Sequence, residues 1–273
     1  MIETADPGGA ALREALYAGR IFRLPARPAS LALVEAAAAA VAAELGPDPR
    51  HAQFALSPAD WLAAIARIRE RLGAEATFRG GVRAVIDAIG WGPDEMVGDA
   101  LRLRAVAHLG HEVPAAAPAY FAHRDTWYAN PQAQVNVWIP LHDVEEVETF
   151  AFYRDRFTRA VANDSDGFDH DRWVREVGWQ NAARPQTAVY PKACEPLDAE
   201  PADGFSARAG EIVLFSASQL HQTRPNTSGR TRFSLDFRVV HLEDHRHGRG
   251  APNVDNRSKG STLETYAPLA GPA

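Results

Sequence analysis

Cysteine is almost absent from this chain of 273 residues, and basic residues are not in excess. Cys194 is the only cysteine, which excludes an intramolecular disulfide and a cysteine-rich zinc finger. Lys and Arg number 29 against 35 Asp and Glu, so the formal net charge is −6. This balance argues against a nucleic-acid-binding face. The sequence therefore predicts no nucleic acid partner.

Long hydrophobic runs are missing as well. The longest, residues 31–45, contains Glu35 and Glu44 and is shorter than the ~20 residues that a membrane span requires. Residues 1–9 contain acids and glycines where a signal peptide needs a basic run and an apolar core. We therefore expect a cytoplasmic protein without a membrane partner, and the sequence leaves its oligomeric state open.

Hydrophobic residues are nevertheless plentiful, at 46% of the chain, which is enough to bury a sizeable core. We expect one domain over 1–273. A mainly helical cover is expected over 1–95 and a β-rich core over 100–245. The core carries a long insertion at 154–205, which is typical of a lid or binding loop, and a tail follows at 246–273.

The periodicity of apolar residues changes along the chain. Ser57 and Pro58 provide an N-cap and a first helical position, and apolar residues then recur every three or four residues up to Leu72. Beyond residue 100, apolar and polar residues alternate, which is the pattern of half-buried strands. Helices are expected at 30–45, 57–73, 78–89 and 171–178, and strands at 101–106, 134–139, 150–153, 210–215 and 232–239.

The strand at 232–239 has two contrasting faces. Phe233, Leu235, Phe237 and Val239 lie on one face, and Arg232, Ser234, Asp236 and Arg238 lie on the other. An apolar face covered by helices and a polar face turned into a cavity are typical of a β-sandwich or barrel with an internal active site.

A possible metal site is marked by His123, Asp125 and His221. In an extended segment, His123 and Asp125 point to the same side, so an imidazole and a carboxylate can bind one ion. His221 follows an apolar strand, where a side chain can reach the mouth of a cavity. Two histidines and one carboxylate leave coordination positions open, as in non-heme Fe(II) oxygenases, whereas structural zinc takes four protein ligands.

An anion-binding pair follows the second histidine. Arg232 carries a guanidinium that matches a carboxylate in bidentate geometry, and Ser234 on the same strand face can add a hydroxyl donor. This pair predicts a dicarboxylate cosubstrate that reaches from the anchor to the metal. The alternative is that Arg232 is a structural partner of Asp236.

These residues resemble those of Fe(II)/2-oxoglutarate-dependent dioxygenases, in particular the phytanoyl-CoA hydroxylase-like branch. The resemblance covers about residues 102–240. It rests on the order and spacing of His123-x-Asp125, Gly210-Glu211, His221 and the segment from Pro225 to Ser234. The N-terminal third matches only in being helical, and the insertion at 154–205 contains no motif that aligns.

The resemblance implies a mainly β fold with flanking helices around a double-stranded β-helix of the jelly-roll or cupin type. It implies iron on His123, Asp125 and His221, and 2-oxoglutarate on Arg232 and Ser234. Gln134, Asn136 and Trp138 stand where such enzymes often contact the cosubstrate. Oxygen and 2-oxoglutarate would give succinate, carbon dioxide and an oxidant for an unactivated carbon. The carboxylate of Asp125 favours hydroxylation, desaturation or ring chemistry over halogenation.

The substrate is expected to be a small molecule, either a natural-product intermediate or an amino-acid-like compound. Alternation along the strands, or adjacency to the metal ligands, makes Arg102, Arg104, Trp127, Tyr128 and Arg238 candidate substrate contacts, and a pair of arginines in the cavity would favour a carboxylate or phosphate. Two alternatives remain: a zinc hydrolase with the same three ligands, and a non-catalytic cupin-like protein that binds a small molecule.

Three other polar clusters are interpreted as structural. The segment containing His241, Glu243, His245 and His247 is expected to be solvated, because it follows the last strand and has no distal partner. The segment from Asp164 to Gly167 lacks the acidic positions of a calcium loop and is expected to be an exposed loop. Asp169, His170 and Asp171 are expected to cap a helix.

Overall fold

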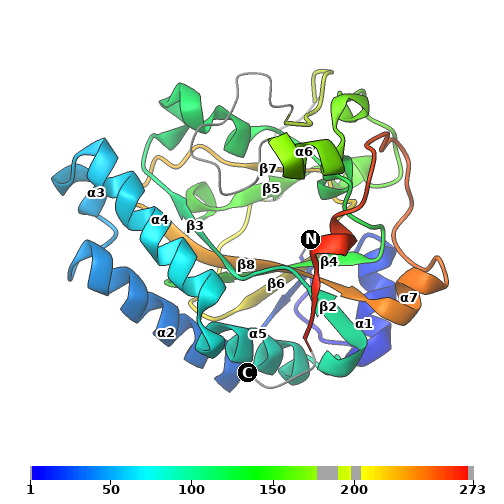
Figure 1. Ribbon diagram of the computed structural model, residues 1–273, viewed down its shortest axis with the longest axis horizontal. Helices are drawn as coiled ribbons and strands as arrows, with labels where there is room; N and C mark the ends of the chain where they lie inside the picture. The colour runs from blue at the N-terminus through cyan, green and yellow to red at the C-terminus, as the bar shows by residue number, and fades with distance from the viewer. Residues whose placement is uncertain (1, 177–189, 198–203, 270–273) are drawn as a thin grey trace.

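The computed structural model describes residues 2–176, 190–197 and 204–269 (Figure 1). Seven strands of these residues form one antiparallel sheet, in the order β1-β6-β4-β8-β2-β9, with β3 paired to the first half of β8. The strands in chain order are β1 Phe22–Leu24, β2 Met96–Gly98, β3 Arg102–Val106, β4 Gln134–Pro140, β6 Ile212–Ser216, β8 Arg232–His241 and β9 Ala267–Pro268. The four longest strands of this sheet are the four predicted for it, because only they are long enough to show an alternating pattern.

The apolar face of the sheet is covered by N-terminal helices, as predicted. These are α1 Gly9–Tyr17, α2 Pro28–Leu45, α4 Pro58–Ala74 and α5 Ala76–Ala88, with a single short turn, α3 Ala52–Ala55, between α2 and α4. Ser57 caps α4 by accepting a hydrogen bond from the backbone N–H of Asp60 at 3.1 Å. Phe233, Leu235 and Phe237 of β8 are at most 1% exposed against these helices. The opposite face of β8 is therefore free to build the site.

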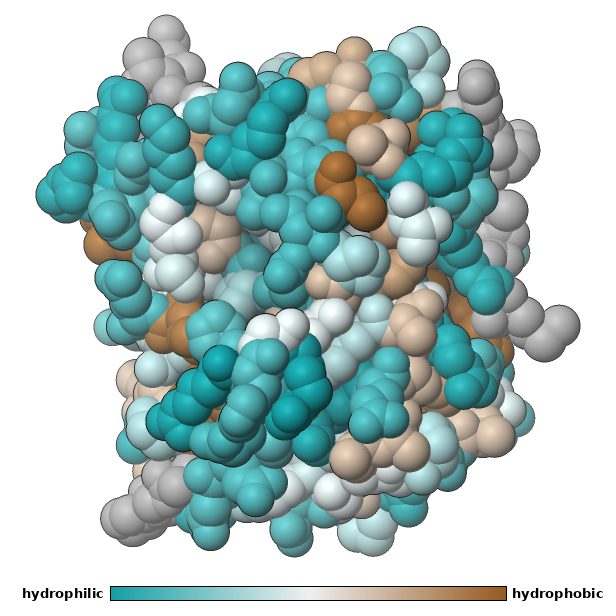
Figure 2. Space-filling view, turned by 90° about the vertical axis from the view of Figure 1, so that its right-hand side faces the viewer, coloured by the Kyte–Doolittle hydropathy of each residue, from teal (hydrophilic) through white to brown (hydrophobic). Residues whose placement is uncertain are grey.

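One helix of the described residues, α2, is long and apolar enough to span a membrane by length and composition alone. In the fold it packs against α4 and α5, and Leu33, Ala37 and Val41 on its buried side belong to the core. The face on the right of Figure 1 is mainly hydrophilic, with hydrophobic side chains in small separate groups (Figure 2). The contacts of α2 are those of a core helix.

A second, two-stranded sheet lies across the polar face of the main sheet (Figure 1). It pairs β5 Phe150–Phe152 with β7 His221–Thr223, and Phe152 stands opposite His221. Phe150, Phe152, Phe205, Phe215 and Trp138 fill the space between the two sheets. Strand β7 has only three residues, too few for a period, and was not predicted as a strand.

The C-terminal part of the chain corrects two predictions. His241 is 6% exposed rather than solvated, because it ends β8 and accepts a hydrogen bond from Asp244 at the start of α7, Leu242–Arg246. His245 and His247 are exposed, as predicted. Residues 246–269 form more than a tail, since β9 pairs with β2 and other residues of this segment hold the site described below.

The insertion is partly described. Asp169 accepts a hydrogen bond from the backbone N–H of Arg172 and so caps α6, His170–Glu176, as predicted. The end of the helix predicted over 171–178 lies outside the described residues. In the loop before α6, Asp166 is exposed but Ser165 is completely buried, so the prediction of an exposed loop holds only in part.

Candidate metal centre

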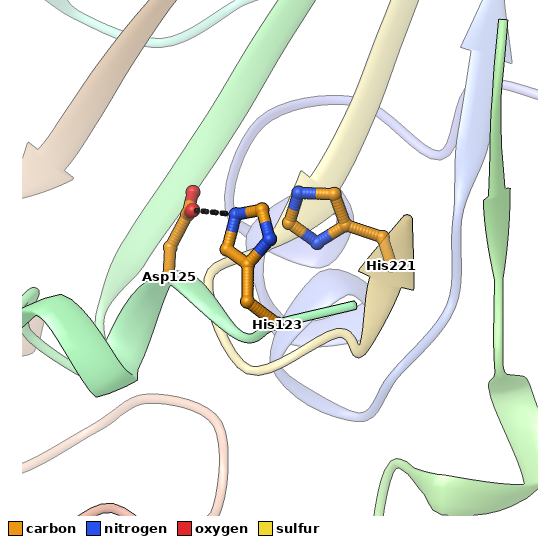
Figure 3. A group of neighbouring side chains, drawn as sticks. All are labelled: His123, Asp125 and His221. Atoms are coloured by element: carbon orange, nitrogen blue, oxygen red, sulfur yellow. Dashed lines mark ion pairs between the residues drawn. The ribbon is translucent and has the colours of Figure 1, made fainter. Parts of the chain in front are cut away.

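His123 and His221 are held side by side by the backbone. Each residue donates its N–H to the carbonyl of the other at 3.0 Å, which is the reciprocal pair of an antiparallel bridge. The ring centroids are 4.5 Å apart. Arg124 continues the extended backbone, and Asp125 begins a 3₁₀ turn over Asp125–Tyr128. The extended segment predicted at His123 thus ends one residue before Asp125, with both side chains still directed to the same place (Figure 3).

Both imidazole rings are oriented by backbone carbonyls. Nδ1 of His123 lies 2.8 Å from the carbonyl oxygen of Phe121, and Nδ1 of His221 lies 3.0 Å from that of Gln219. A carbonyl only accepts hydrogen bonds, so each Nδ1 carries the proton and each Nε2 keeps its lone pair for a metal. Burial, aided by the neighbouring His123, lowers the pKa of His221 to about 4. The ring is therefore neutral at pH 7, as a metal ligand must be.

The carboxylate of Asp125 completes the cluster. One ligand atom each from His123, Asp125 and His221 lies within 4.8 Å of the other two. Oδ1 of Asp125 is 3.4 Å from Nε2 of His123 (Figure 3). Oδ2 accepts a hydrogen bond from Asn136 at 2.6 Å and lies 3.7 Å from Nε of Arg238. The two oxygens thus have different surroundings, and Oδ1 is the one directed toward the histidines.

Asp125 is ionised although it is buried. Burial by itself raises the pKa of this carboxyl, but the guanidinium of Arg238 is the largest opposing influence and holds the pKa well below its usual range. An ionised carboxylate beside two imidazole rings is a donor set that suits a divalent metal.

A directional chain of hydrogen bonds supports Asp125 from the C-terminal segment. The hydroxyl of Tyr266 donates to Gln134 at 2.6 Å, the amide of Gln134 donates to Asn136 at 2.9 Å, and the amide of Asn136 donates to Asp125. Gln134 and Asn136 were predicted to contact a cosubstrate. In the structure, their amides form the chain that orients the carboxylate of Asp125, and a contact with a cosubstrate stays a prediction.

Arg124, between the two ligands of the His-x-Asp motif, ties both ligand-bearing segments together. Its side chain is 1% exposed and forms an ion pair with Asp255 at 3.1 Å. It also donates to the carbonyl of Ser218, in the loop before His221, and to the carbonyls of Arg156 and Arg159. Sequence reasoning missed this role. The available signal was an arginine in an extended segment whose side chain must point away from its ligand neighbours.

Arg232 and Ser234 lie together as predicted. Arg232 is 3% exposed, donates through Nε to the carbonyl of Glu148 at 3.0 Å, and donates through Nη1 to Oγ of Ser234. Burial, with Arg104 nearby, lowers the pKa of its guanidinium to about 10. It forms no ion pair with any carboxylate of the described residues, so the alternative pairing with Asp236 is not formed. Within the described part of the chain, Arg232 is thus a buried cation without an ion-pair partner.

Trp138 borders the same space. Its ring lies 5.7 Å from the guanidinium carbon of Arg232, and its indole Nε1 is buried with no hydrogen-bond partner among the described residues. A buried N–H without a partner is costly, which is why such groups commonly face a ligand or water.

The five candidate substrate contacts have different surroundings. Arg102 and Arg238 pair with Asp99 at 2.9 and 3.3 Å, and Arg104 pairs with Asp236 at 2.8 Å.

The phenol of Tyr128 donates to the carbonyl of Pro191, and its ring contacts His123 edge-on at 5.5 Å. Trp127 is completely buried and donates to Asp255 at 2.7 Å. The polar atom of Trp127 is thus already bonded within the protein, and a contact of its ring with substrate stays a prediction.

No protein-family model matches the chain, and no curated protein matches it. Structural comparison matches the non-heme monooxygenase ThoJ in its apo form, with 17% identity and a TM-score of 0.45 over 86% of this chain and 84% of that chain. It also matches two non-heme α-ketoglutarate-dependent enzymes of nogalamycin biosynthesis. These are the carbocyclase SnoK (12% identity, TM-score 0.41, 93% and 96% covered) and the epimerase SnoN (15%, 0.39, 96% and 100%).

Proposed function

We propose that this protein is a non-heme Fe(II)- and 2-oxoglutarate-dependent oxygenase that acts on a small molecule. The observation that carries the proposal is the convergence of His123, Asp125 and His221. Arg232, a buried cation that has no ion-pair partner among the described residues, supports it. The core is proposed to be a double-stranded β-helix in which β4 and β8 face β5 and β7 across the site. The phytanoyl-CoA hydroxylase-like branch remains a prediction from the motifs.

The three side chains fit a divalent iron. His123 and His221 offer neutral Nε2 atoms, and Asp125 offers one oxygen while its second is held by Asn136. Three protein ligands on one side leave positions open for cosubstrate and oxygen. Iron bound there would supply the activation of oxygen, and the chain would supply fixed rings, one negative charge and an enclosed space.

The second carboxylate of 2-oxoglutarate fits the pocket of Arg232. The guanidinium and the hydroxyl of Ser234 provide donors on one strand face, and Trp138 provides a buried indole N–H. Binding of the dicarboxylate would neutralise the buried cation and give the indole a partner.

We propose hydroxylation as the reaction and a natural-product intermediate or amino-acid-like compound as the substrate, in the cytoplasm. The presence of Asp125 favours hydroxylation over halogenation. A zinc hydrolase with the same ligands would have no use for an anchor for a dicarboxylate such as Arg232 with Ser234, and a non-catalytic binding protein would not consume oxygen. Oxygen-dependent release of succinate separates the three functions.

The direct test is anaerobic addition of Fe(II) and 2-oxoglutarate to the purified protein. A visible charge-transfer band is expected, because a keto acid would chelate the iron through two oxygens. Asp125→Ala and His221→Ala should each abolish the band, whereas His245→Ala, which changes an exposed histidine, should leave it intact. A band that persists in Asp125→Ala would contradict the ligand assignment.

A further inference from the structure

A charged surface adjoins the candidate metal centre on the polar face of the main sheet. It consists of Arg102 and Arg104 on β3, Asp236 and Arg238 on β8, and Asp99, which precedes β3. Arg104 stands opposite Ser234, and Arg102 opposite Asp236, in the β3–β8 register. Residues two apart on one strand face are separated by about 7 Å, so Asp236 lies one such step from Ser234 and one from Arg238. A molecule at this charged surface would therefore lie next to both the cosubstrate anchor and the metal ligand Asp125.

The charged surface has one more cation than anions. Asp99 is shared by Arg102 and Arg238, and Asp236 pairs with Arg104. Among the described residues, three guanidinium groups of this surface thus face two carboxylates. With the proposed metal and cosubstrate bound, the two positive charges of the metal and the one of Arg232 would balance the one negative charge of Asp125 and the two of the dicarboxylate. The excess positive charge of the charged surface would therefore remain.

Arg104 is the member of the charged surface that can best receive an anion. Its hydrogen bond to a described residue runs from Nε to Oδ2 of Asp236 at 2.8 Å, and its side chain is 45% exposed. Asp236 therefore fixes the plane of the guanidinium through one edge. The two terminal nitrogens form the other edge, whose fork matches the two oxygens of a carboxylate.

We propose that Arg104, oriented by Asp236, is a substrate-binding residue that holds a carboxylate of the substrate, so that the substrate is an organic acid. This inference rests on the proposed function, because it takes the centre at Asp125 as the place of reaction. A single excess charge fits a carboxylate better than a doubly charged phosphate. Arg102 and Arg238 both form ion pairs with Asp99. Asp236 is therefore available to pair with Arg104.

The inference is tested on protein loaded with Co(II) and saturating 2-oxoglutarate. The probes are benzoate, its neutral amide benzamide, and phenyl phosphate, and the readout is broadening of their ring protons by the paramagnetic Co(II) in NMR spectra. Only a probe bound near the metal is broadened, so surface arginines do not contribute. Benzoate should be broadened in a saturable manner and benzamide should not. Arg104→Gln should weaken benzoate binding at least about tenfold, since it removes a charge-assisted bidentate contact.

Arg67→Gln is the matched control, because Arg67 is 57% exposed on α4 and pairs with Glu44 on the helical side of the molecule. It should leave broadening of benzoate unchanged. Equal broadening of benzoate and benzamide, no broadening of either, or unchanged benzoate binding in Arg104→Gln would overturn the inference. Stronger broadening of phenyl phosphate than of benzoate would overturn the assignment to a carboxylate. Failure of the protein to bind Co(II) at all would instead overturn the proposed function.

Discussion

At the scale of single residues, the orientation of Asp125, the proposed metal ligand, depends on Asn136. Asn136→Leu keeps the approximate size of the side chain and removes the donor to Oδ2 of Asp125. The carboxylate can then rotate, and we expect the affinity for Co(II) or Fe(II) to fall about 10- to 100-fold, as for other residues that orient metal ligands. Metal titration followed by visible absorption measures this. Asn253→Leu, at an exposed asparagine, is the control, and equal affinities in the two variants would contradict the role of Asn136.

Arg124 is expected to stabilise the fold as well as to position the segments that carry His123, Asp125 and His221. Arg124→Met removes a guanidinium that is 1% exposed and leaves the carboxylate of Asp255 buried without its partner. Loss of one partner of a buried ion pair costs about 3 to 5 kcal/mol, so the free energy of unfolding should fall by that amount in urea titrations. Arg67→Met, at an exposed ion pair, should cost under about 1 kcal/mol. If Arg124→Met also lowered the free energy of unfolding by less than about 1 kcal/mol, the contacts of Arg124 would contribute little to stability.

At the scale of elements, the start of β8 is fixed by a side chain of the loop after β4. The backbone N–H of Phe233, between Arg232 and Ser234, donates to Nε2 of His142 at 3.0 Å. Nδ1 of His142 faces the carbonyl of Asp143, so the ring must be neutral for Nε2 to accept. Burial lowers the pKa of His142 to about 4.

This hydrogen bond makes stability depend on pH. The pKa of His142 is about 4 in the folded chain against 6.5 for an ordinary histidine, so the unfolded chain binds the proton first as the pH falls. Stability should therefore decrease from pH 6.5 to pH 4, by about 2 kcal/mol from this residue. His142→Gln, which can still accept the hydrogen bond, should flatten the decrease measured by urea unfolding at pH 7 and pH 4.5. His245→Gln should keep the native decrease, and a native-like decrease in His142→Gln would assign it to other groups.

Most of the elements that could be predicted from the sequence are long enough to carry a period, and the three-residue strand β5 is an exception. Strand β8 alternates over ten residues and α4 repeats an apolar stripe over 17, so one face of each could be assigned. Strands β1, β2 and β7 have three residues each, which is too short for any period. They form because a neighbouring strand offers its free edge, and that neighbour is distant in the sequence.

At the scale of the whole molecule, residues 246–269 connect the C-terminus of the described chain to the site. Asp255 accepts hydrogen bonds from Arg124 and Trp127, and Tyr266 begins the chain of donors that ends at Asp125. The prediction that His123, Asp125 and His221 lie together is confirmed by the structure. The supporting contacts were not predictable, because irregular segments have no period and their partners lie over 100 residues away.

Substitution of Tyr266 tests whether the hydrogen bonds of the C-terminal segment affect the candidate metal centre. Tyr266→Phe removes one hydroxyl donor to Gln134, so the amides of Gln134 and Asn136 lose the constraint that sets their direction. One neutral hydrogen bond is worth about 1 kcal/mol, and we expect metal affinity to weaken about fivefold if most of that energy is coupled to Asp125. Tyr17→Phe removes a buried hydroxyl that lies 3.2 Å from both Asp244 and the backbone carbonyl of Ala133 and bonds no side chain of the chain that leads to Asp125. It should lower thermal stability and leave metal affinity unchanged. Because both variants lose a buried hydroxyl, only a difference in metal titration assigns Tyr266 to the site; equal affinities would confine its hydroxyl to holding the C-terminal segment in place.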